Sequence, residues 1–227
     1  MRALIFDLDD TLVVEDAAAT AAFESVAGSP ERAALVRGRA RDLWRAAPVH
    51  PYCLRVGISS SEALWCRFEG DAPEIRWLRD WAPSHRREAW QDIGDPDRFG
   101  EERRARHENF GDVGVLDELD GPLVLLTNGA SCLQREKLAA SGLADRFDAV
   151  VISGDLGVGK PEAAIFRHAL DLVGASEGVM IGDSVERDIE GALNAGLEGV
   201  WLNRSGDPGP DVPQIASLRE LAARLAA

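Results

Sequence analysis

The sequence predicts an α/β fold, a doubly wound parallel sheet, with an all-helical module inserted after the first strand. Three observations support this prediction. Short apolar runs alternate with stretches of helical period, polar residues follow the runs directly, and residues 14–109 read as helices separated by Gly, Pro and Ser. Alternating strands and helices form sheets that bind ligands at the carboxyl ends of their strands. We therefore expect a functional site at that edge.

The expected strands are short apolar runs, the pattern of strands buried on both faces of a sheet. They lie at residues 3–6, 123–126, 149–152, 179–181 and 199–202, and the helices between them at 132–141, 162–173 and 186–195. These assignments place residues 1–13 and 110–227 in one α/β core. Residues 206–213 read as a turn-rich linker into a last short helix.

Residues 14–109 form the expected insertion. Ser29 followed by Pro30 is typical of a helix N-cap with proline at the first helical position. Helices are expected at residues 17–27, 30–46, 60–69, 73–93 and 96–109, and a break of the fourth helix near Pro83 is left open. The insertion is thus predicted to be a helical cap.

Charge excludes some partners. The chain of 227 residues has a formal net charge of -14 and a pI near 4.7. Such a chain lacks the basic surface of nucleic-acid-binding proteins and should be repelled by anionic membranes. Residues 17–108 contain 15 Arg and 15 Asp plus Glu, so all of the net charge lies outside them. This asymmetry indicates two modules with different tasks.

Targeting signals are not evident. The first apolar run ends at Asp7, and no later segment approaches the roughly 18 apolar residues of a membrane span. Cys53, Cys66 and Cys132 are an odd number without metal-like spacing, which favours reduced, mostly buried thiols. We expect a cytoplasmic protein.

Two acids at the end of the first strand are candidates for catalysis. Asp7 and Asp9 lie two residues apart, so in extended geometry their side chains point the same way. Two such carboxylates repel unless a divalent cation lies between them or one holds a proton, and this suits metal-assisted nucleophilic chemistry with a separate general acid. Asp10 should point away and form a turn or cap. For an isolated pair of acids, a solvated acidic turn is the alternative.

Other strand ends also carry polar residues. Thr127, Asn128 and Gly129 supply a hydroxyl, an amide and a backbone that can approach a ligand, although an N-capping turn would use the same residues. Asp183 follows the fourth run and is placed to bind the same cation. Asp188 follows one turn later, where it either supports the cation or complements a helix dipole.

Lys160 follows the third run. It and Lys137 are the only lysines among 25 basic residues. A lysine in a chain that otherwise uses arginine indicates a need for a compact point charge, as phosphate binding often has. Because all four segments follow predicted parallel strands, they should converge on one edge of the sheet.

In order and spacing, these segments resemble the four signature motifs of the haloacid dehalogenase superfamily. The segments are Asp7-Leu-Asp-Asp-Thr, Thr127-Asn-Gly, Gly159-Lys-Pro and Gly182-Asp-Ser with Asp188. The helical cap that some members insert after the first motif matches residues 14–109. The resemblance implies a Rossmann-like core with the first strand central and a cap that closes over the site.

The resemblance also implies roles for the residues. Asp7 would attack phosphorus to give an aspartyl-phosphate, while Asp9 would protonate the leaving alcohol and then activate water. Thr127, the Asn128 backbone and Lys160 would hold the phosphoryl oxygens. Mg²⁺ would be bound by Asp7, the Asp9 carbonyl and Asp183, while Asp188 would support either the metal or Lys160. Thr11, Gly129 and Ser184 would occupy supporting places.

The acid at position 9 separates branches of the superfamily. Haloacid dehalogenases themselves lack it, because a halide leaving group needs no proton. Its presence implies a magnesium-dependent phosphatase that acts on a small phosphorylated metabolite, such as a sugar or sugar-acid phosphate, a nucleotide or phosphoglycolate. One departure from the family pattern is Glu162-Ala163 after the Lys-Pro pair, where many relatives have Asp-Pro.

Five of the six tryptophans lie in the insertion. Trp77 and Trp81 share a helix face at i, i+4, which is typical of core packing. Among the arginines of the insertion, Arg55 and Arg67 are our candidates for facing the substrate.

Three other functions are weighed. A phosphomutase shares the acid pair. A signalling receiver also combines acids, a hydroxyl and a lysine, but its phospho-acceptor does not lie on the first strand and it has no such cap. A catalytically silent binding protein is disfavoured because no motif position is lost. Substrate identity and oligomeric state stay open.

Overall fold

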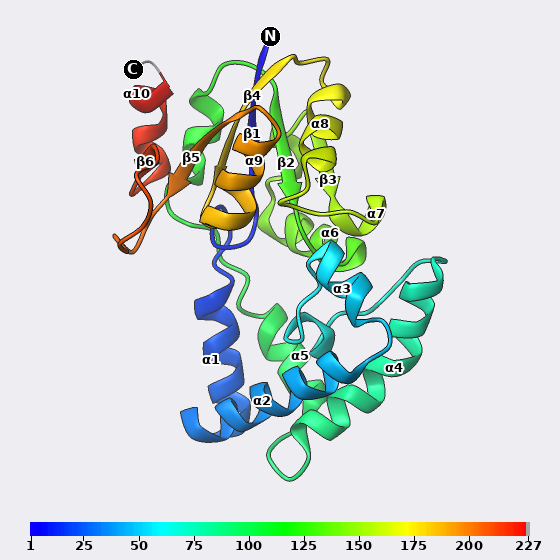
Figure 1. The fold of residues 1–227 in the computed structure, drawn as a ribbon. Helices are drawn as coiled ribbons and strands as arrows, with labels where there is room; N and C mark the ends of the chain where they lie inside the picture. The colour runs from blue at the N-terminus through cyan, green and yellow to red at the C-terminus, as the bar shows by residue number, and fades with distance from the viewer. Residues whose placement is uncertain (226–227) are drawn as a thin grey trace.

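Six parallel strands form one sheet in the order β3-β2-β1-β4-β5-β6 (Figure 1). The computed structural model describes residues 1–225. The strands are β1 (Arg2–Phe6), β2 (Leu123–Thr127), β3 (Ala149–Ile152), β4 (Glu177–Gly182), β5 (Glu198–Leu202) and β6 (Gln214–Ile215). All five expected strands are present, which confirms the α/β, Rossmann-like class. The sequence does not predict β6, because two residues in a turn-rich tail carry no strand pattern.

The strands around β1 end at the same level. Phe6 at the end of β1 pairs with Leu125 in β2 and with Ile181 in β4. The chain runs from β1 through β2 to β3 and then continues at β4 on the other side of β1. The connections therefore diverge beside the carboxyl end of β1, which is where open α/β sheets bind ligands.

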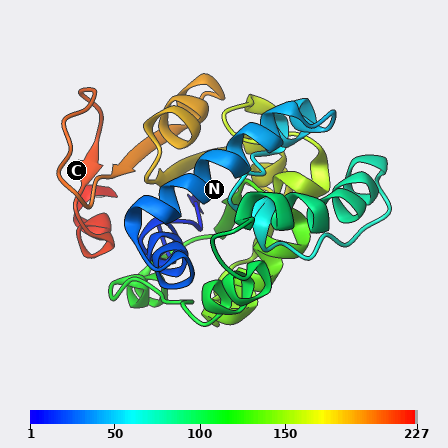
Figure 2. The same cartoon turned by 90° about the horizontal axis from the view of Figure 1, so that it is seen from below.

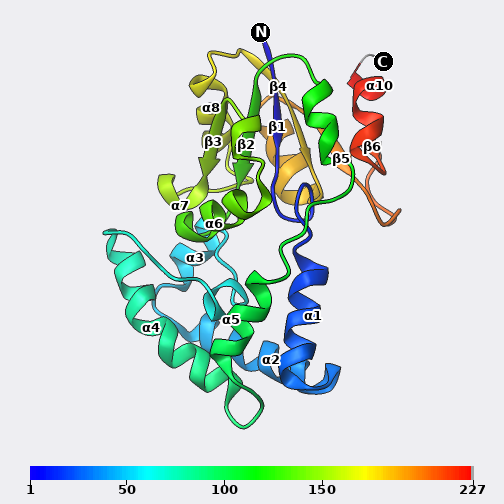
Figure 3. The ribbon, with the colours of Figure 1, turned by 180° about the vertical axis from the view of Figure 1, so that it is seen from behind.

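Helices cover both faces of the sheet (Figures 1 and 3). One face is covered by α8 (Ala163–Leu172) and α9 (Gly191–Asn194), and the other by α6 (Ser131–Ser141), the 3₁₀-helix η2 (Val113–Glu118) and α10 (Leu221–Leu225). Alternate residues of β1 divide between the two layers, with Ile5 buried under α8 and Phe6 on the opposite side. This alternation fixes which side chains the strand ends present.

A second group of helices lies beyond the carboxyl edge of the sheet. It consists of α1 (Asp16–Ala27), α2 (Pro30–Ala46), α3 (His50–Val56), the 3₁₀-helix η1 (Glu62–Leu64), α4 (Pro73–Trp90) and α5 (Pro96–Arg104). Seen from below in Figure 2, the blue and cyan helices lie across the end of the sheet. Their own apolar core is built around Phe23, Trp65, Trp90 and Phe99.

Two adjacent crossings join these helices to the sheet. Val13 forms an antiparallel bridge with Asn109. On either side of it, the Val14 N–H donates to the Glu108 carbonyl at 2.9 Å and the Phe110 N–H donates to the Leu12 carbonyl at 3.0 Å. The division into a core of residues 1–13 and 110–227 and a cap of residues 14–109 stays our prediction, and these crossings support it.

Several expected helices differ from the observed ones. The prediction of a helix at 60–69 is wrong, because only the short η1 forms there. The chain then turns and buries Trp65 and Phe68. Pro83 does not break α4, whose buried face continues on both sides of it. The helix expected at 96–109 ends at Arg104, because the chain there returns to the crossings. The sequence also misses α3.

The other sequence predictions about packing are confirmed. The three cysteines are free, and Cys53 and Cys66 are buried. Trp77 and Trp81 stack with ring centroids 5.3 Å apart and pack against the core of the cap helices. Among the helices of residues 1–225, none is long and apolar enough to cross a membrane.

Candidate active site

The carboxyl ends of β1, β2 and β4 open into a cavity of about 190 Å³ between the sheet and the helices of residues 14–109. Its lining includes six of the residues expected at the site together with side chains that the sequence does not place there. The expected residues are Asp7, Asp9, Thr127, Asn128, Lys160 and Asp183, and the others include Asp10, Glu15, Asp16, Ser61, Glu62, Lys137 and Arg187. The four sequence motifs therefore meet in one place.

Asp7 lies at the end of β1 against a buried lysine. Lys160 Nζ is 2.7 Å from Asp7 Oδ1 and 2.7 Å from Asp188 Oδ1, and all three side chains are almost fully buried. Burial raises the pKa of Asp7, and the charge of Lys160 opposes that rise. Burial alone would lower the pKa of Lys160, but Asp188 and Asp7 raise it above its ordinary value. Lys160 is therefore a permanent cation beside Asp7.

Three carboxylates gather around this lysine. Asp7, Asp183 and Asp188 each offer one oxygen within 4.8 Å of the others. Burial, reinforced by the charges of Asp7 and Asp188, raises the pKa of Asp183 to about 8. Two side-chain cations, Lys160 and Arg187, interact with these three carboxylates and do not compensate them fully. Oxygen donors are the ligands that Mg²⁺ prefers. These residues fit a magnesium ion.

Asn128 fastens the loop after β2 to the segment that carries Lys160. Its Nδ2 donates to the Lys160 carbonyl at 2.9 Å, and its Oδ1 accepts from the Lys160 N–H at 2.8 Å. Thr127 is buried at the end of β2. Gly129, at a φ of 139°, donates its N–H to the Val56 carbonyl at 2.9 Å. Gly129 therefore lies against the backbone of the cap, whereas the sequence predicts that its backbone approaches a ligand.

The supporting residues occupy different places. Ser184 donates its N–H to Asp188 Oδ2 at 3.0 Å and so orients that carboxylate. Thr11 is fully buried, its carbonyl accepts from Arg204 at 2.9 Å, and its N–H donates to the Leu8 carbonyl at 3.4 Å. Thr11 does not line the cavity as described. Asp10, at a φ of 55°, accepts the Glu15 and Asp16 N–H groups and caps α1, which confirms its predicted capping role. The prediction that it points away from the site is wrong, because Asp10 lines the cavity.

Asp9 is held by residues that sequence reasoning missed. Lys137 Nζ lies 3.0 Å and 2.9 Å from its two oxygens, and Gln134 Nε2 donates to Oδ2 at 3.2 Å. Both come from α6, one turn apart. Glu62 of η1 accepts from the same Gln134 amide at 3.2 Å. The one available signal was the rarity of lysine, since the two lysines of the chain are the two cations that contact Asp7 and Asp9.

Burial also affects the acids that accompany Asp9. It raises the pKa of Asp9, and Lys137 opposes the rise. It raises the pKa of Glu62 to about 7, again against the charge of Lys137. For Lys137, burial alone would lower the pKa, but Asp9, Glu15 and Glu62 raise it above its ordinary value. Lys137 therefore stays positively charged while these three acids surround it.

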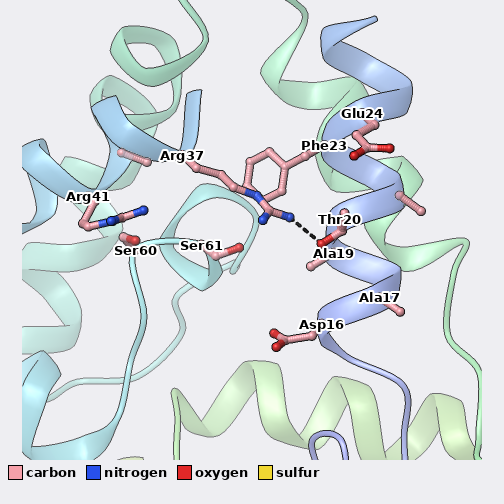
Figure 4. A pocket seen from close by; sticks show the side chains of 12 residues that line it. Asp16, Ala17, Ala19, Thr20, Phe23, Glu24, Arg37, Arg41, Ser60 and Ser61 are labelled. Atoms are coloured by element: carbon pink, nitrogen blue, oxygen red, sulfur yellow. Dashed lines mark hydrogen bonds between the residues drawn. The ribbon is translucent and has the colours of Figure 1, made fainter. Parts of the chain in front are cut away.

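A second cavity of about 580 Å³ adjoins the first (Figure 4). The two share Asp16, Ala19 and Ser61. Arg37, from α2, reaches across it, with its guanidinium 4.6 Å above the Phe23 ring and Nη2 donating to Thr20 Oγ1 at 2.7 Å. The other polar groups that line it are Asp16, Glu24, Arg41, Ser60 and Ser61. This cavity extends the site towards the cap.

The two arginines expected to face the substrate lie elsewhere. Arg55 donates from Nε to the Gly157 carbonyl at 2.8 Å and ties α3 to the core. Arg67 lines a separate cavity with Trp65 and Arg86. The sequence predicts neither α3 nor the irregular segment after η1, so it does not give the directions of the Arg55 and Arg67 side chains. Arg37 and Arg41, instead, line the second cavity.

Comparisons with known proteins agree with this geometry. A family model described as haloacid dehalogenase-like hydrolase matches residues 1–196. A phosphoserine phosphatase from Thermus thermophilus is 36% identical over 97% of this chain and 98% of its own, and an N-acylneuraminate-9-phosphatase from Mus musculus is 34% identical over 91% and 84%. The crystal structure of a HAD phosphatase from Thermococcus onnurineus superposes with a TM-score of 0.68 at 26% identity, covering 99% and 98% of the two chains. The likeness spans the inserted helices as well as the sheet.

Proposed function

The chain belongs to the haloacid dehalogenase-like hydrolases and is a phosphoric monoester hydrolase, and from this premise we propose that it is a magnesium-dependent phosphatase of a small phosphorylated metabolite. The observation that carries the proposal is the placement of Asp7, which lies beside Lys160 and within one carboxylate cluster with Asp183 and Asp188. A nucleophile, a cation for the phosphoryl group and oxygen ligands for a metal thus share one cavity.

The reaction proceeds in two steps at Asp7. An Asp7 oxygen attacks phosphorus, the bond from phosphorus to the alcohol oxygen breaks, and Asp9 gives its proton to that oxygen. Water then attacks the aspartyl-phosphate, Asp9 accepts a proton from the water, and phosphate leaves. Asp9 ends as it began, protonated. Asp7 and Asp9 both line the cavity, which supports these roles.

The phosphoryl group would be held by residues that follow two strands, β2 and β3. Lys160 supplies a positive charge, and the Thr127 hydroxyl and the Asn128 N–H supply hydrogen bonds to phosphoryl oxygens. Asp7, Asp183 and the Asp9 carbonyl would hold Mg²⁺, with Asp188 supporting it. When bound, the ion would neutralise charge on the phosphoryl group and on Asp7.

We further infer that the leaving group carries a carboxylate. Arg37 and Arg41 line the second cavity together with the Ser60 and Ser61 hydroxyls and the carboxylates of Asp16 and Glu24. The guanidinium groups can bind a carboxylate, and the hydroxyls and acids suit further polar or cationic groups of the same small molecule. Serine and N-acylneuraminate, which the names of two relatives give as the alcohols released, are both carboxylic acids.

A phosphate-release screen with Mg²⁺ tests the proposal. It compares phosphate esters of hydroxy acids, amino acids and sugar acids with esters of neutral alcohols. We expect the acidic esters to give the higher kcat/KM, and Asp7→Asn and excess chelator each to abolish turnover. Arg37→Met and Arg41→Met should raise KM for acidic esters, while Arg45→Met, an exposed control on the same helix, should not. Absence of phosphate release from the whole panel would refute phosphatase activity, and equal use of neutral esters would refute only the carboxylate.

A further inference from the structure

We propose that Lys137 is the positioning residue of Asp9, and that Glu62 and Gln134 hold it in that task; the inference rests on the proposed function. Lys137 contacts no part of the phosphoryl site around Lys160 in the described structure. Its ammonium instead contacts both oxygens of Asp9, at 3.0 Å and 2.9 Å. A cation that touches both oxygens fixes the plane of the carboxyl group. It thereby determines where the proton of Asp9 is directed.

The ammonium itself is fixed from several sides. The Lys137 side chain is 1% exposed, whereas Asp9 is 25% exposed and faces the cavity. Besides Asp9, Lys137 Nζ lies 3.0 Å from Glu15 Oε2 and 3.7 Å from Glu62 Oε1. Glu15 is paired in turn with Arg103, a fully buried arginine of α5. A lysine that is anchored in this way has few other positions to occupy, and Asp9, at 25% exposure, is the most exposed of its three carboxylate partners.

Gln134 supplies a second hold on Asp9. It lies on the same face of α6 as Lys137, at i and i+3, and is fully buried. Its Nε2 donates to Asp9 Oδ2 at 3.2 Å, to Glu62 Oε1 at 3.2 Å and to the Asn128 carbonyl at 3.0 Å. One side chain thus connects the general acid, the phosphate-binding loop and the inserted helices.

Glu62 makes the arrangement depend on the cap. Glu62 Oε2 accepts a hydrogen bond from the Ser59 N–H at 2.8 Å, so the loop before η1 fixes the direction in which Glu62 Oε1 points. Glu62 belongs to residues 14–109, whereas Lys137 and Gln134 belong to α6. The full set of contacts around Asp9 therefore forms when η1 lies against α6.

The experiment separates proton donation from phosphoryl transfer by changing the leaving group. An alkyl phosphate needs a proton on its departing oxygen, whereas p-nitrophenyl phosphate releases a stable anion. Because kcat/KM reports the steps up to departure of the alcohol, we expect Lys137→Met to lower kcat/KM about 100-fold for an alkyl ester and only a few-fold for p-nitrophenyl phosphate, since general acid catalysis is worth about 10² to 10⁴. Glu62→Gln should also lower kcat/KM more for the alkyl ester than for p-nitrophenyl phosphate, but by a smaller factor.

Two further variants complete the test. Arg135→Met removes a charge from an exposed position of the same helix, where Arg135 pairs with Asp155, and should leave both esters unaffected. If Lys137→Met does not fold, as judged by circular dichroism and gel filtration, the uncharged change Gln134→Met takes its place with an expected loss of about ten-fold, again for the alkyl ester. Equal losses for the two esters, or no loss, would overturn the positioning role. A wild-type enzyme inactive on both would overturn the proposed function and this inference with it.

Discussion

At the scale of single residues, each of the two acids after β1 has its own lysine. Lys160 contacts Asp7, and Lys137 contacts Asp9. A lysine ammonium is compact and fits between converging carboxylates, whereas a guanidinium is planar and broad. This explains why a chain with 23 arginines keeps lysine at these two places.

The first prediction concerns Lys160. Lys160→Met leaves Asp7, Asp183 and Asp188 without their ammonium, and breaking such a buried set costs about 3 to 5 kcal/mol. In chelator the melting temperature should fall by about 10 °C. Mg²⁺ should raise it more in the variant than in the wild type, because the variant keeps only Arg187 of the two side-chain cations that interact with these carboxylates in the described residues. Differential scanning fluorimetry with a Mg²⁺ titration measures both, and an equal Mg²⁺ shift in the two proteins would contradict the account.

The residues predictable from sequence are those at strand ends. Asp7, Thr127 and Asp183 follow apolar runs directly, so the topology alone brings them together. Lys137 and Gln134 lie inside a helix, and the direction of their side chains depends on how α6 packs. Glu62 lies in a segment that the sequence assigns to a longer helix. Their contacts with Asp9 join parts of the chain that no local pattern connects.

At the scale of elements, the last residue of β4 is packed tightly against the site. A Cβ on Gly182 would lie 2.2 Å from Asp188 Oδ2 and 2.4 Å from its Cγ. The Asp188 carboxylate, which accepts from Ser184 and pairs with Lys160, occupies that space. The absence of a side chain at the end of this strand thus allows the acid to reach the cluster.

Gly182→Ala should therefore displace Asp188 without removing any charged group. We expect the apparent affinity for Mg²⁺ and kcat/KM to fall about 100-fold, as for changes of residues that orient metal ligands, while the circular dichroism spectrum stays native. Gly114→Ala is the control, since its Cβ would meet nothing within 4 Å. Similar Mg²⁺ affinities in the two variants would argue against the displacement.

Asp112 joins the start of η2 to the C-terminal elements. It accepts two hydrogen bonds from Arg204, at 2.8 Å and 2.9 Å, one from the Ser217 hydroxyl at 2.7 Å and one from the Leu218 N–H at 2.9 Å. Burial alone would raise the pKa of Asp112, but these hydrogen bonds and the charge of Arg204 lower it to about 2. The ionised carboxylate therefore stabilises the fold.

Asp112→Asn should lower the free energy of unfolding by about 2 kcal/mol at neutral pH. Because the pKa is lower in the folded state than in the unfolded state, this contribution is present above pH 4 and disappears as the pH falls towards 2. Urea unfolding of both proteins at pH 7, 5 and 3.5 measures it. The difference should be constant from pH 7 to 5 and smaller at pH 3.5, and a difference that grows on acidification would contradict the assignment.

At the scale of the whole molecule, contacts across the cavity hold the inserted helices against the core. Gly129 N–H and the Ser153 hydroxyl both donate to the Val56 carbonyl, at 2.9 Å and 2.5 Å. Nearby, Cys66 Sγ lies 3.5 Å from Cys132 Sγ, with one thiol on each side. The hydrogen bond from Cys66 lowers the pKa of Cys132 to about 7.

Mild oxidation should link these two cysteines. A disulfide needs sulfur atoms about 2 Å apart, so a small approach suffices, and the thiolate of Cys132 is the attacking form above neutral pH. Treatment with diamide at pH 8 followed by peptide mass spectrometry should show a Cys66–Cys132 bridge within one chain and an unmodified Cys53. Cys132→Ser is the control. A bridge to Cys53, or none, would contradict the contact between the two modules.

The paired crossings at Val13 and Asn109 have a further consequence for how such enzymes diversify. The segments that lead into and out of the inserted helices lie side by side and are hydrogen-bonded to each other. The helices between them could therefore be exchanged for others without a change in the topology of the sheet. The contacts of Glu15 and Glu62 with Lys137 limit that freedom. A replacement segment would bring its own cavity lining, but it would have to return two acids to Lys137 for Asp9 to keep the contacts on which its proposed role depends.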